Sequence, residues 1–303
     1  SLPFNSMSNT QVKLLSASQI AGLSTTQISS LSTAKLSQLS AAQLAAFSND
    51  DVAALTTDQT AGLGVTQLKA LSASQIASMS ADLVESLTTT QFKSLSNTQL
   101  TALTTDAVAK LTADKVNQLT SAQIKSLTTT QVAALSTNVT ASLSTTSLAA
   151  LSTSQINALA TSVLANLNTA QTTALTSAQV KALSSNSFTS LTTTQLQALT
   201  TTQLQSVDIE DLNALSTAQV QLLSTSQVQA LSVTQLAGLS TAALSAMTTA
   251  QVSSFKDAQV RALSVDQIGS LTTTQINKMG TAQLAAMSTD DIVALSSAQV
   301  GAL

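Results

Sequence analysis

The 303-residue sequence contains no cysteine, histidine, tryptophan or tyrosine. Without cysteine and histidine, the usual nucleophilic triads, thiolate sites and zinc sites cannot be built. The sequence also has no glycine-rich loop of the kind that holds phosphates. We therefore expect a protein that is not an enzyme, with no catalytic, cofactor-binding or metal-binding residues and no cofactor.

Charge and long apolar runs are scarce as well. Charged residues make up 8% of the chain, the net charge is −3, and the basic residues are scattered singly. Such a surface does not attract nucleic acid or an anionic membrane. No run approaches the roughly 18 apolar residues that a membrane-spanning helix requires. We therefore predict no nucleic-acid partner and no membrane span. The absence of cysteine leaves the redox compartment open, although a disulfide-free repeat rich in serine and threonine tolerates the outside of a cell.

The sequence that remains is one phrase of eight residues, L-[ST]-x-x-Q-[VIL]-x-[AS], repeated 37 times without insertion or deletion from Met7 to Leu303. The first position, here called the anchor, is apolar at all 38 occurrences. The next is Ser, Thr, Asn or Asp in 33 of 37 octads, and the exceptions are Gly64, Ala160, Lys256 and Gly280. Gln follows three residues later in 25 octads. Such regularity indicates a repeat architecture.

The phrase predicts the start of a helix in every octad. Ser or Thr followed three residues later by Gln is a capping box, and the apolar residues on either side form a hydrophobic staple. In one octad Ser24 is the cap, Gln27 completes the box and Leu23 packs against Ile28. The next cap follows Leu31, so each helix lasts only about six residues, and each leucine joins two helices.

The positions of the charges support this interpretation. A helix favours acids in its first turn and bases in its last. Of 14 acidic residues, 13 fall between the cap and the third helical position, with Glu85 as the exception. Of 11 basic residues, eight occupy the last two positions of an octad. The helix dipole must therefore restart every eight residues.

Two other folds fit the pattern less well. In one continuous helix the apolar residues would drift around the axis by roughly 80° per octad and leave no fixed stripe. In a β-solenoid the two apolar positions, five residues apart, would lie on opposite faces of a strand. Turn residues are also rare, with seven Gly and one Pro. We predict an all-α fold, a single superhelical α-solenoid of very short helices, one per octad.

The remaining octad positions predict how the helices pack. The last position is mostly Ala, Ser or Gly, which indicates close approach to a neighbouring helix, while the position before it carries Lys, Gln, Asn or Arg and should face water. The anchor, the fourth helical residue and the small last residue are expected to point inward. Ser, Thr and Gln are expected to cover the exterior. The pattern fixes neither the handedness of the superhelix nor its number of helices per turn.

Two regions are expected along the chain: a non-repeat N-terminal end, residues 1–6, and a continuous octapeptide-repeat solenoid of 37 octads, residues 7–303. A start in mid-phrase at Ser1 suggests a fragment of a longer array. The most acidic spot is Asp208-Ile209-Glu210-Asp211, where a metal site is a weaker interpretation than carboxylates placed by the helix dipole. Adjacent acid pairs at other helix starts imply no pocket, and the phenylalanines at apolar positions are expected in the core.

The repeated phrase, seen for instance from Leu127 to Leu135 as L-T-T-T-Q-V-A-A-L, resembles the octapeptide-repeat regions of very large secreted or surface-exposed bacterial adhesin-like proteins. The resemblance spans residues 7–303. It implies a bacterial protein located outside the cell or on its surface, acting as a stalk, spacer or filament.

The first function hypothesis is a non-catalytic structural repeat, an extracellular spacer or filament-forming subunit. Its expected partner is the chain itself, end to end or laterally. The alternative is a surface binding module for glycans, ice or another protein, with a cell-surface or glycan partner. Threonine runs such as Thr88–Thr90 and Thr200–Thr202 would supply its hydroxyls.

Overall fold

The computed structural model describes residues 6–303, and over that range it contains 37 short α-helices and no strand. The predicted all-α solenoid with one helix per octad is confirmed. Residues 1–5, which make up most of the expected non-repeat end, lie outside the described residues. The chain divides into two compact units, residues 1–158 and 159–303, which are described separately below.

The first unit contains α1 to α19, each four to six residues long. Their bounds are α1 Asn9–Lys13, α2 Ala17–Ala21, α3 Thr25–Ser29, α4 Thr33–Leu36, α5 Ala41–Ala45, α6 Asn49–Ala53, α7 Thr57–Ala61, α8 Val65–Ala70, α9 Ala73–Ala77, α10 Ala81–Ser86, α11 Thr89–Lys93, α12 Asn97–Thr101, α13 Thr105–Ala109, α14 Ala113–Asn117, α15 Ser121–Ser126, α16 Thr129–Ala134, α17 Thr137–Ala141, α18 Thr145–Ala150 and α19 Thr153–Asn157.

The second unit contains α20 to α37, of the same lengths. Their bounds are α20 Thr161–Ala165, α21 Thr169–Ala174, α22 Ser177–Lys181, α23 Ser185–Thr189, α24 Thr193–Ala198, α25 Thr201–Gln205, α26 Ile209–Asn213, α27 Thr217–Leu222, α28 Thr225–Ala230, α29 Val233–Ala237, α30 Thr241–Ala246, α31 Thr249–Ser253, α32 Asp257–Ala262, α33 Val265–Gly269, α34 Thr273–Asn277, α35 Thr281–Ala286, α36 Thr289–Ala294 and α37 Ser297–Val300.

Helix α11 shows how one octad folds. The Thr88 hydroxyl accepts a hydrogen bond from the Gln91 backbone N–H at 3.2 Å, and Gln91 Oε1 accepts one from the Thr88 N–H at 2.7 Å. The helix closes where the Leu95 N–H bonds to the Phe92 carbonyl at 3.2 Å. Leucine and the next cap residue are extended, as at Leu87 with φ −57° and ψ 134°. No described residue has a positive φ, so the turns between consecutive helices do not require glycine.

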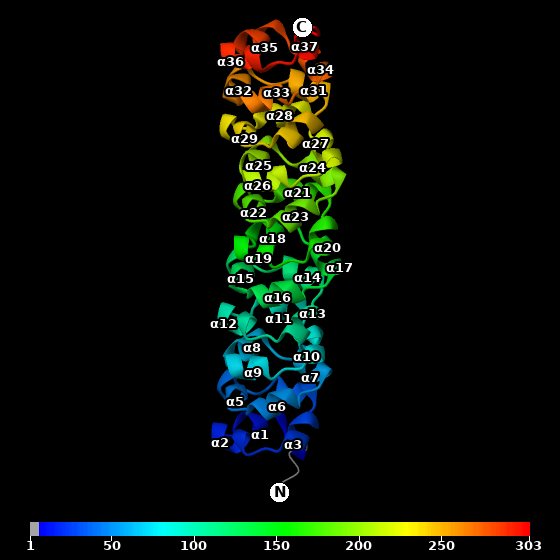
Figure 1. The fold of residues 1–303 in the computed structure, drawn as a ribbon. Helices are drawn as coiled ribbons and strands as arrows, with labels where there is room; N and C mark the ends of the chain where they lie inside the picture. Colours follow the sequence, from blue (N-terminus) through cyan, green and yellow to red (C-terminus); the bar gives the residue numbers. More distant parts are fainter. Residues whose placement is uncertain (1–5) are drawn as a thin grey trace. The chain divides into compact units, whose positions relative to one another are not determined.

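Within each unit the helices wind in successive turns, and each helix packs against the third one along the chain (Figure 1). In the first unit α5 contacts α8 and α13 contacts α16. In the second unit α29 contacts α32 and α33 contacts α36. A helix of five residues buries too little surface to persist alone. Its stability must therefore come from these neighbours, as in other solenoids.

The core of each unit is built from the anchor and the fourth helical residue, as predicted. Phe92 and Phe188 are completely buried at the fourth position, and the phenylalanines expected in the core lie there. Threonine replaces the apolar residue at Thr60, Thr140 and Thr172, and all three are buried. Each of their hydroxyls donates to the carbonyl four residues earlier at 2.9–3.2 Å, which removes the cost of burying a polar group.

The small last residue of each octad lies against the first residue of the helix three earlier. A Cβ placed on Gly62 would be 3.4 Å from Thr33 Cβ, and one on Gly238 would be 2.6 Å from Ile209 Cδ1. In the same arrangement the Ser206 hydroxyl donates to the Ser177 carbonyl at 2.9 Å. The predicted close approach is confirmed, and it explains why large side chains are rare at this position.

Candidate functional site

The most consistently built polar group is the glutamine at the third helical position. All 25 of these glutamines accept a hydrogen bond from the N–H of their own cap residue through Oε1, at 2.7–3.0 Å. The bond forms even at Gly64, Lys256 and Gly280, where no cap side chain accepts from the helix. The amide oxygen of each of these glutamines therefore serves the N-terminal end of its own helix.

The other end of the same amide reaches a helix four positions earlier in the chain. Gln131 Nε2 donates to the Leu103 carbonyl at 2.8 Å and to the Leu100 carbonyl at 2.9 Å. Gln235 repeats this with the carbonyls of Val207 and Leu204, at 2.8 and 3.0 Å. At least nineteen of the described glutamines bond in this way to the anchor carbonyl 28 residues before them, at 2.6–2.9 Å. We call this bond the glutamine stitch.

The stitch supplies hydrogen-bond partners for the backbone groups that a very short helix leaves unpaired. An α-helix leaves its first four N–H groups and its last four carbonyls without partners inside the helix, so a five-residue helix satisfies almost nothing by itself. One glutamine serves the N-terminal end of its own helix and the C-terminal end of another. Because packing joins each helix to the third one along and the stitch joins it to the fourth, each unit has between three and four helices per turn.

The prediction that glutamine covers the exterior is wrong. Gln131 and Gln235 are 3% and 5% exposed. A capping box accepts Glu as readily as Gln, and the helix dipole favours Glu, yet no octad has Glu at this position. The preference for Gln over Glu could have predicted this burial, because only the amide can donate a hydrogen bond as well as accept one. Gln11 and Gln19 cap their helices but are exposed, since no described helix lies four positions before them.

Twelve octads lack the glutamine, and their substitutes fall into apolar, hydroxyl, acidic and basic classes. Lys115 is the buried basic case, 6% exposed, and its ammonium donates to the Glu85 carbonyl. Burial lowers the pKa of the Lys115 ammonium, and the nearby Glu85 carboxylate only partly opposes this. A lysine has no acceptor, so it replaces the donating half of the stitch and leaves out the capping half.

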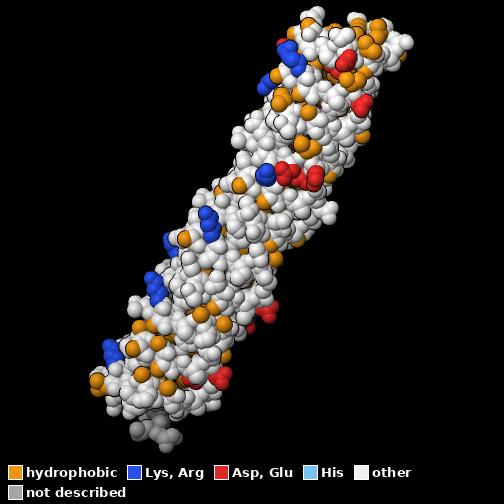
Figure 2. Space-filling view, turned by 60° about the vertical axis from the view of Figure 1, so that its left-hand side comes forward, with side chains coloured by type: hydrophobic (Ala, Val, Ile, Leu, Met, Phe, Trp, Pro, Cys, Tyr) orange, Lys and Arg blue, Asp and Glu red, His pale blue; other side chains and the backbone are white. Residues whose placement is uncertain are grey.

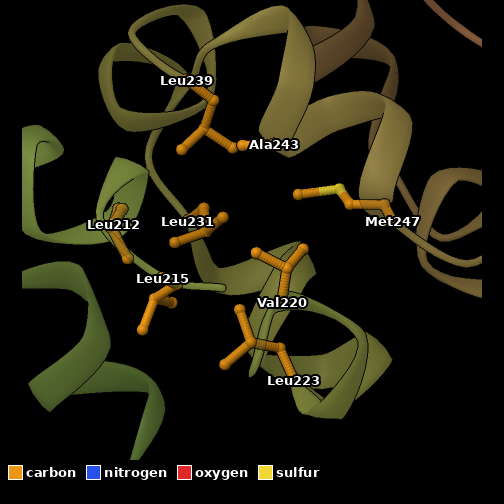
Figure 3. A pocket seen from close by; sticks show the side chains of 8 residues that line it. All are labelled: Leu212, Leu215, Val220, Leu223, Leu231, Leu239, Ala243 and Met247. Atoms are coloured by element: carbon orange, nitrogen blue, oxygen red, sulfur yellow. The ribbon is translucent and has the colours of Figure 1, made fainter. Parts of the chain in front are cut away.

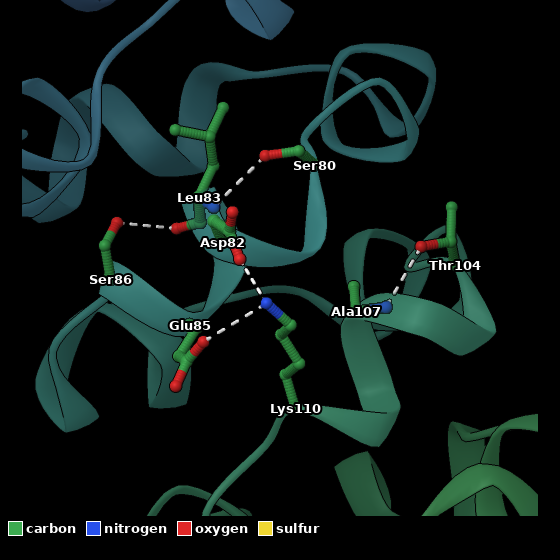
Figure 4. A network of polar contacts seen from close by, with 8 residues as sticks. All are labelled: Ser80, Asp82, Leu83, Glu85, Ser86, Thr104, Ala107 and Lys110. Atoms are coloured by element: carbon green, nitrogen blue, oxygen red, sulfur yellow. Dashed lines mark hydrogen bonds and ion pairs between the residues drawn. The ribbon is translucent and has the colours of Figure 1, made fainter.

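A surface cluster of charges links α13 with α10 (Figure 4). Lys110, at the end of α13, pairs with Asp82 and, at 3.7 Å, with the Glu85 carboxylate of α10. The hydrogen bond and charge of Asp82 raise the pKa of Lys110, with Glu85 adding to the effect. All three side chains are about half exposed or more. Such exposed pairs contribute little to stability, so this cluster is a surface link between neighbouring turns.

Asparagine replaces part of the stitch in one octad of each unit. Asn117 Oδ1 accepts from the Ser144 N–H at 2.8 Å, and its Nδ2 donates to the Ser142 carbonyl at 3.0 Å. Asn213 does the same for Ser240 at 2.7 Å and Gly238 at 3.0 Å. The helices so served begin with octads whose third helical residue is serine or alanine. The cap N–H that lacks a glutamine partner is thus satisfied by an asparagine of the helix four earlier.

The most acidic spot lies at the start of α26, where Asp208 is the cap residue but its side chain makes no hydrogen bond to the helix. Asp208 is exposed and lies 3.4 Å from the Lys181 ammonium, whereas Asp211 is 6% exposed and accepts from the Ser185 hydroxyl at 2.5 Å. Within residues 6–303 no three acidic side chains converge in a way that could hold a metal ion. Asp51 and Asp291, which occupy the same octad position as Asp211, instead accept from their cap N–H, both at 2.8 Å.

On the face drawn in Figure 2, charged side chains are scattered singly or in small groups among uncharged atoms. All residues of the threonine runs at 88–90 and 200–202 are exposed. In each run the first threonine is a cap, and the two that follow project from the first turn. The described part of the chain has no helix with both the length and the apolar character needed to span a bilayer.

Comparison with known proteins supports the repeat character of the chain. The family model described as the ALTTAQ repeat matches residues 208–241, 241–273 and 273–303. The matched segment contains a close version of that phrase, A-M-T-T-A-Q, from Ala246 to Gln251. Each match covers about four octads, which is the separation that the stitch bridges. No curated protein matches the chain. The C-terminal third therefore resembles ALTTAQ repeats, and the same octad continues through the rest of the sequence.

Proposed function

We propose that this chain is a non-catalytic structural repeat that acts as a spacer outside the cell or on its surface. The observation that carries the proposal is the stitch. The one polar side chain that recurs inside the fold is committed at both ends to holding helices together. The extracellular location rests on the resemblance to adhesin-like octapeptide regions and on a sequence without cysteine.

A spacer must hold a distance that scales with its number of repeats. An octad with the complete phrase contributes the same cap, the same core pair and the same link to the helix four earlier, so adding such octads adds equivalent steps. Bonds at 28–31 residues of separation tie each turn only to its neighbours, as in a one-dimensional array. We expect a rigid element whose length is set by the octad count.

Pulsed electron spin resonance within the first unit tests this. Since the chain has no cysteine, nitroxide labels can be attached at cysteines replacing the exposed Ala21, Ala77 and Ala133. Seven octads separate the first pair and fourteen the outer pair. We expect two narrow distance distributions, the longer mean being about twice the shorter. A flexible chain would give broad distributions whose means grow only as the square root of length, and that result would rule out a spacer.

Self-association is the second part of the proposal. Identical octads present the same donors and acceptors on successive turns, so copies of the chain offer each other matching surfaces. Sedimentation velocity over a wide concentration range should show species heavier than the monomer as concentration rises. A monomer throughout would remove the filament role and leave the spacer role standing.

The exposed threonine runs favour one alternative function, a binding surface for glycans or ice. In Thr88–Thr90 only the first hydroxyl caps a helix, so the other two face solvent. Glycan-array binding or inhibition of ice recrystallisation that is lost when Thr89 and Thr90 are replaced by Ala would support it. No binding in either assay would leave the spacer as the function.

A further inference from the structure

Ala243 creates a gap in the pattern of stitches. It occupies the third helical position of α30 and is 8% exposed. A glutamine there would donate to the carbonyls 31 and 28 residues earlier, those of Leu212 and Leu215. The Leu212 carbonyl accepts a weak bond from the Leu215 N–H at 3.4 Å. Among the described residues the Leu215 carbonyl has no donor, although Leu215 is only 8% exposed.

A cavity marks the place of the missing side chain. Leu212, Leu215, Leu239, Ala243 and Met247 surround a core space of about 10 Å³, and in Figure 3 their side chains face one another across it. A second space of about 90 Å³ adjoins it, because Leu215 and Ala243 line both. One water needs roughly 10–15 Å³, so the second space has room for a group larger than a water molecule.

The gap at Ala243 lacks a hydrogen-bond donor but not an acceptor. In other octads the amide oxygen accepts from the cap N–H, but here Asn213 already accepts from the Ser240 N–H at 2.7 Å. What the site lacks is a donor aimed at the Leu215 carbonyl. The larger space is also lined by Thr217, Ser240 and Ala242, all of them exposed, so a ligand can enter from solvent.

We propose that the gap at Ala243 is a binding site for a primary carboxamide. The atoms that distinguish alanine from glutamine are those of acetamide, a methyl carbon joined to CONH₂. Its NH₂ would donate to the Leu215 carbonyl, as glutamine Nε2 does to the equivalent carbonyl elsewhere, and its methyl group would contact the apolar lining. This site is independent of the proposed spacer role.

Acetamide titration tests the site in the full-length protein. With ¹³C-methyl methionine, the Met247 methyl resonance, assigned with Met247→Leu, should shift and saturate, while those of Met279 and Met287 stay fixed. Acetone, which has the shape of acetamide but no N–H, should give no saturable shift. An unresponsive Met247, or an equal response to acetone, would overturn the proposal and leave a gap filled by solvent.

Two variants separate this site from general effects of the additive. Ala243→Gln fills the gap with its own amide and should abolish the acetamide response. Ala107→Gln installs the same side chain at the matching position of α13, also buried, and should leave the Met247 response intact. A response that persists in Ala243→Gln would contradict the proposal. Should that variant fail to fold, the acetamide and acetone titrations of the wild type still decide the question.

Discussion

At the scale of single residues, the fold depends on an amide that donates and accepts at once. Serine, threonine and leucine set where each helix begins and ends, and glutamine is the residue that repeatedly hydrogen-bonds one turn to the next. A buried group that can make both bonds stabilises the structure, and a partner left unsatisfied costs more than the bond itself contributes. Substitutions that keep the size of the side chain and remove one of the two functions separate these contributions.

Gln131→Glu removes the donor and keeps the acceptor. The carboxylate still accepts from the Thr128 N–H, but at neutral pH it places a buried negative charge against the carbonyls of Leu100 and Leu103. We expect a loss of about 2–3 kcal/mol in the free energy of unfolding, measured by urea denaturation. The matched control is Gln19→Glu, whose side chain caps its helix but is exposed, and which should change stability by less than about 0.5 kcal/mol. Equal effects of the two substitutions would show that the stitch adds nothing.

Lys115→Gln should stabilise the protein by about 1 kcal/mol, because it supplies the missing cap acceptor and removes a buried charge. The gain should depend on pH. The pKa of folded Lys115 lies below its ordinary value of 10.5, so between the two values the unfolded chain binds more protons and wild-type stability rises with pH. The advantage of the variant is therefore largest at neutral pH and shrinks as pH approaches 10.5.

The control for Lys115→Gln is Lys125→Gln, which removes a positive charge from an exposed position. Its effect should stay within about 0.5 kcal/mol. Denaturation series of both variants and the wild type between pH 7 and pH 10.5 supply the comparison. An advantage of Lys115→Gln that stays constant over this range would show that burial of the charge is not its source.

At the scale of helices, a small residue at the end of each octad sets how closely a helix approaches the third one before it. Gly238, at the end of α29, is the tightest case, because an added Cβ would lie 2.6 Å from Cδ1 and 2.9 Å from Cγ2 of Ile209. Both atoms belong to a β-branched side chain, whose χ1 rotamers are restricted, so the contacts are not easily relieved. The pair therefore fixes the spacing of α26 and α29.

Gly238→Ala should destabilise the protein by about 1–3 kcal/mol, the range for overpacking. Ile209→Ala should restore most of the loss in the double variant, since it removes the atoms that clash. Gly269→Ala is the control, because its nearest contact would be an ordinary 3.6 Å to the Ala294 carbonyl, and it should gain about 0.5–1 kcal/mol from helix propensity. Additive effects of Gly238→Ala and Ile209→Ala in thermal unfolding would contradict the contact.

The elements could be predicted almost completely from the sequence, whereas their connections could not. Helix starts follow from local chemistry, as in Thr88 and Gln91, and need no knowledge of distant residues. The stitch joins residues such as Leu103 and Gln131, and every octad offers the same anchor carbonyl, so periodicity gives no clue to which one is bonded. The gap at Ala243 could not be predicted from the sequence for the same reason, because it is identified by the Leu215 carbonyl, which lies 28 residues earlier in the chain.

At the scale of the whole molecule, equivalent octads make the chain tolerant of changes in length that preserve the phrase. A stitching glutamine bonds to the anchor carbonyl 28 residues before it, whichever octad that carbonyl belongs to. Deleting one complete octad re-pairs the later glutamines with different but equivalent leucines. Deleting half an octad instead places cap residues at positions where core residues belong. Core packing and stitches should then be lost over several helices on both sides of the deletion.

Deletion of residues 224–231, one full octad in the second unit, should therefore leave a folded protein with unchanged helix content per residue and cooperative unfolding, measured by circular dichroism during heating. After it, Gln235 should bond to the Leu199 carbonyl in place of that of Val207, and both carbonyls already serve as acceptors in the intact chain. Deletion of residues 224–227 is the control and should lower the unfolding temperature far more, because it breaks the register of anchor and cap. Should both deletions be equally harmful, particular octads would have to be matched to one another. The number of octads could then not vary freely, and this result would contradict a spacer built from equivalent octads.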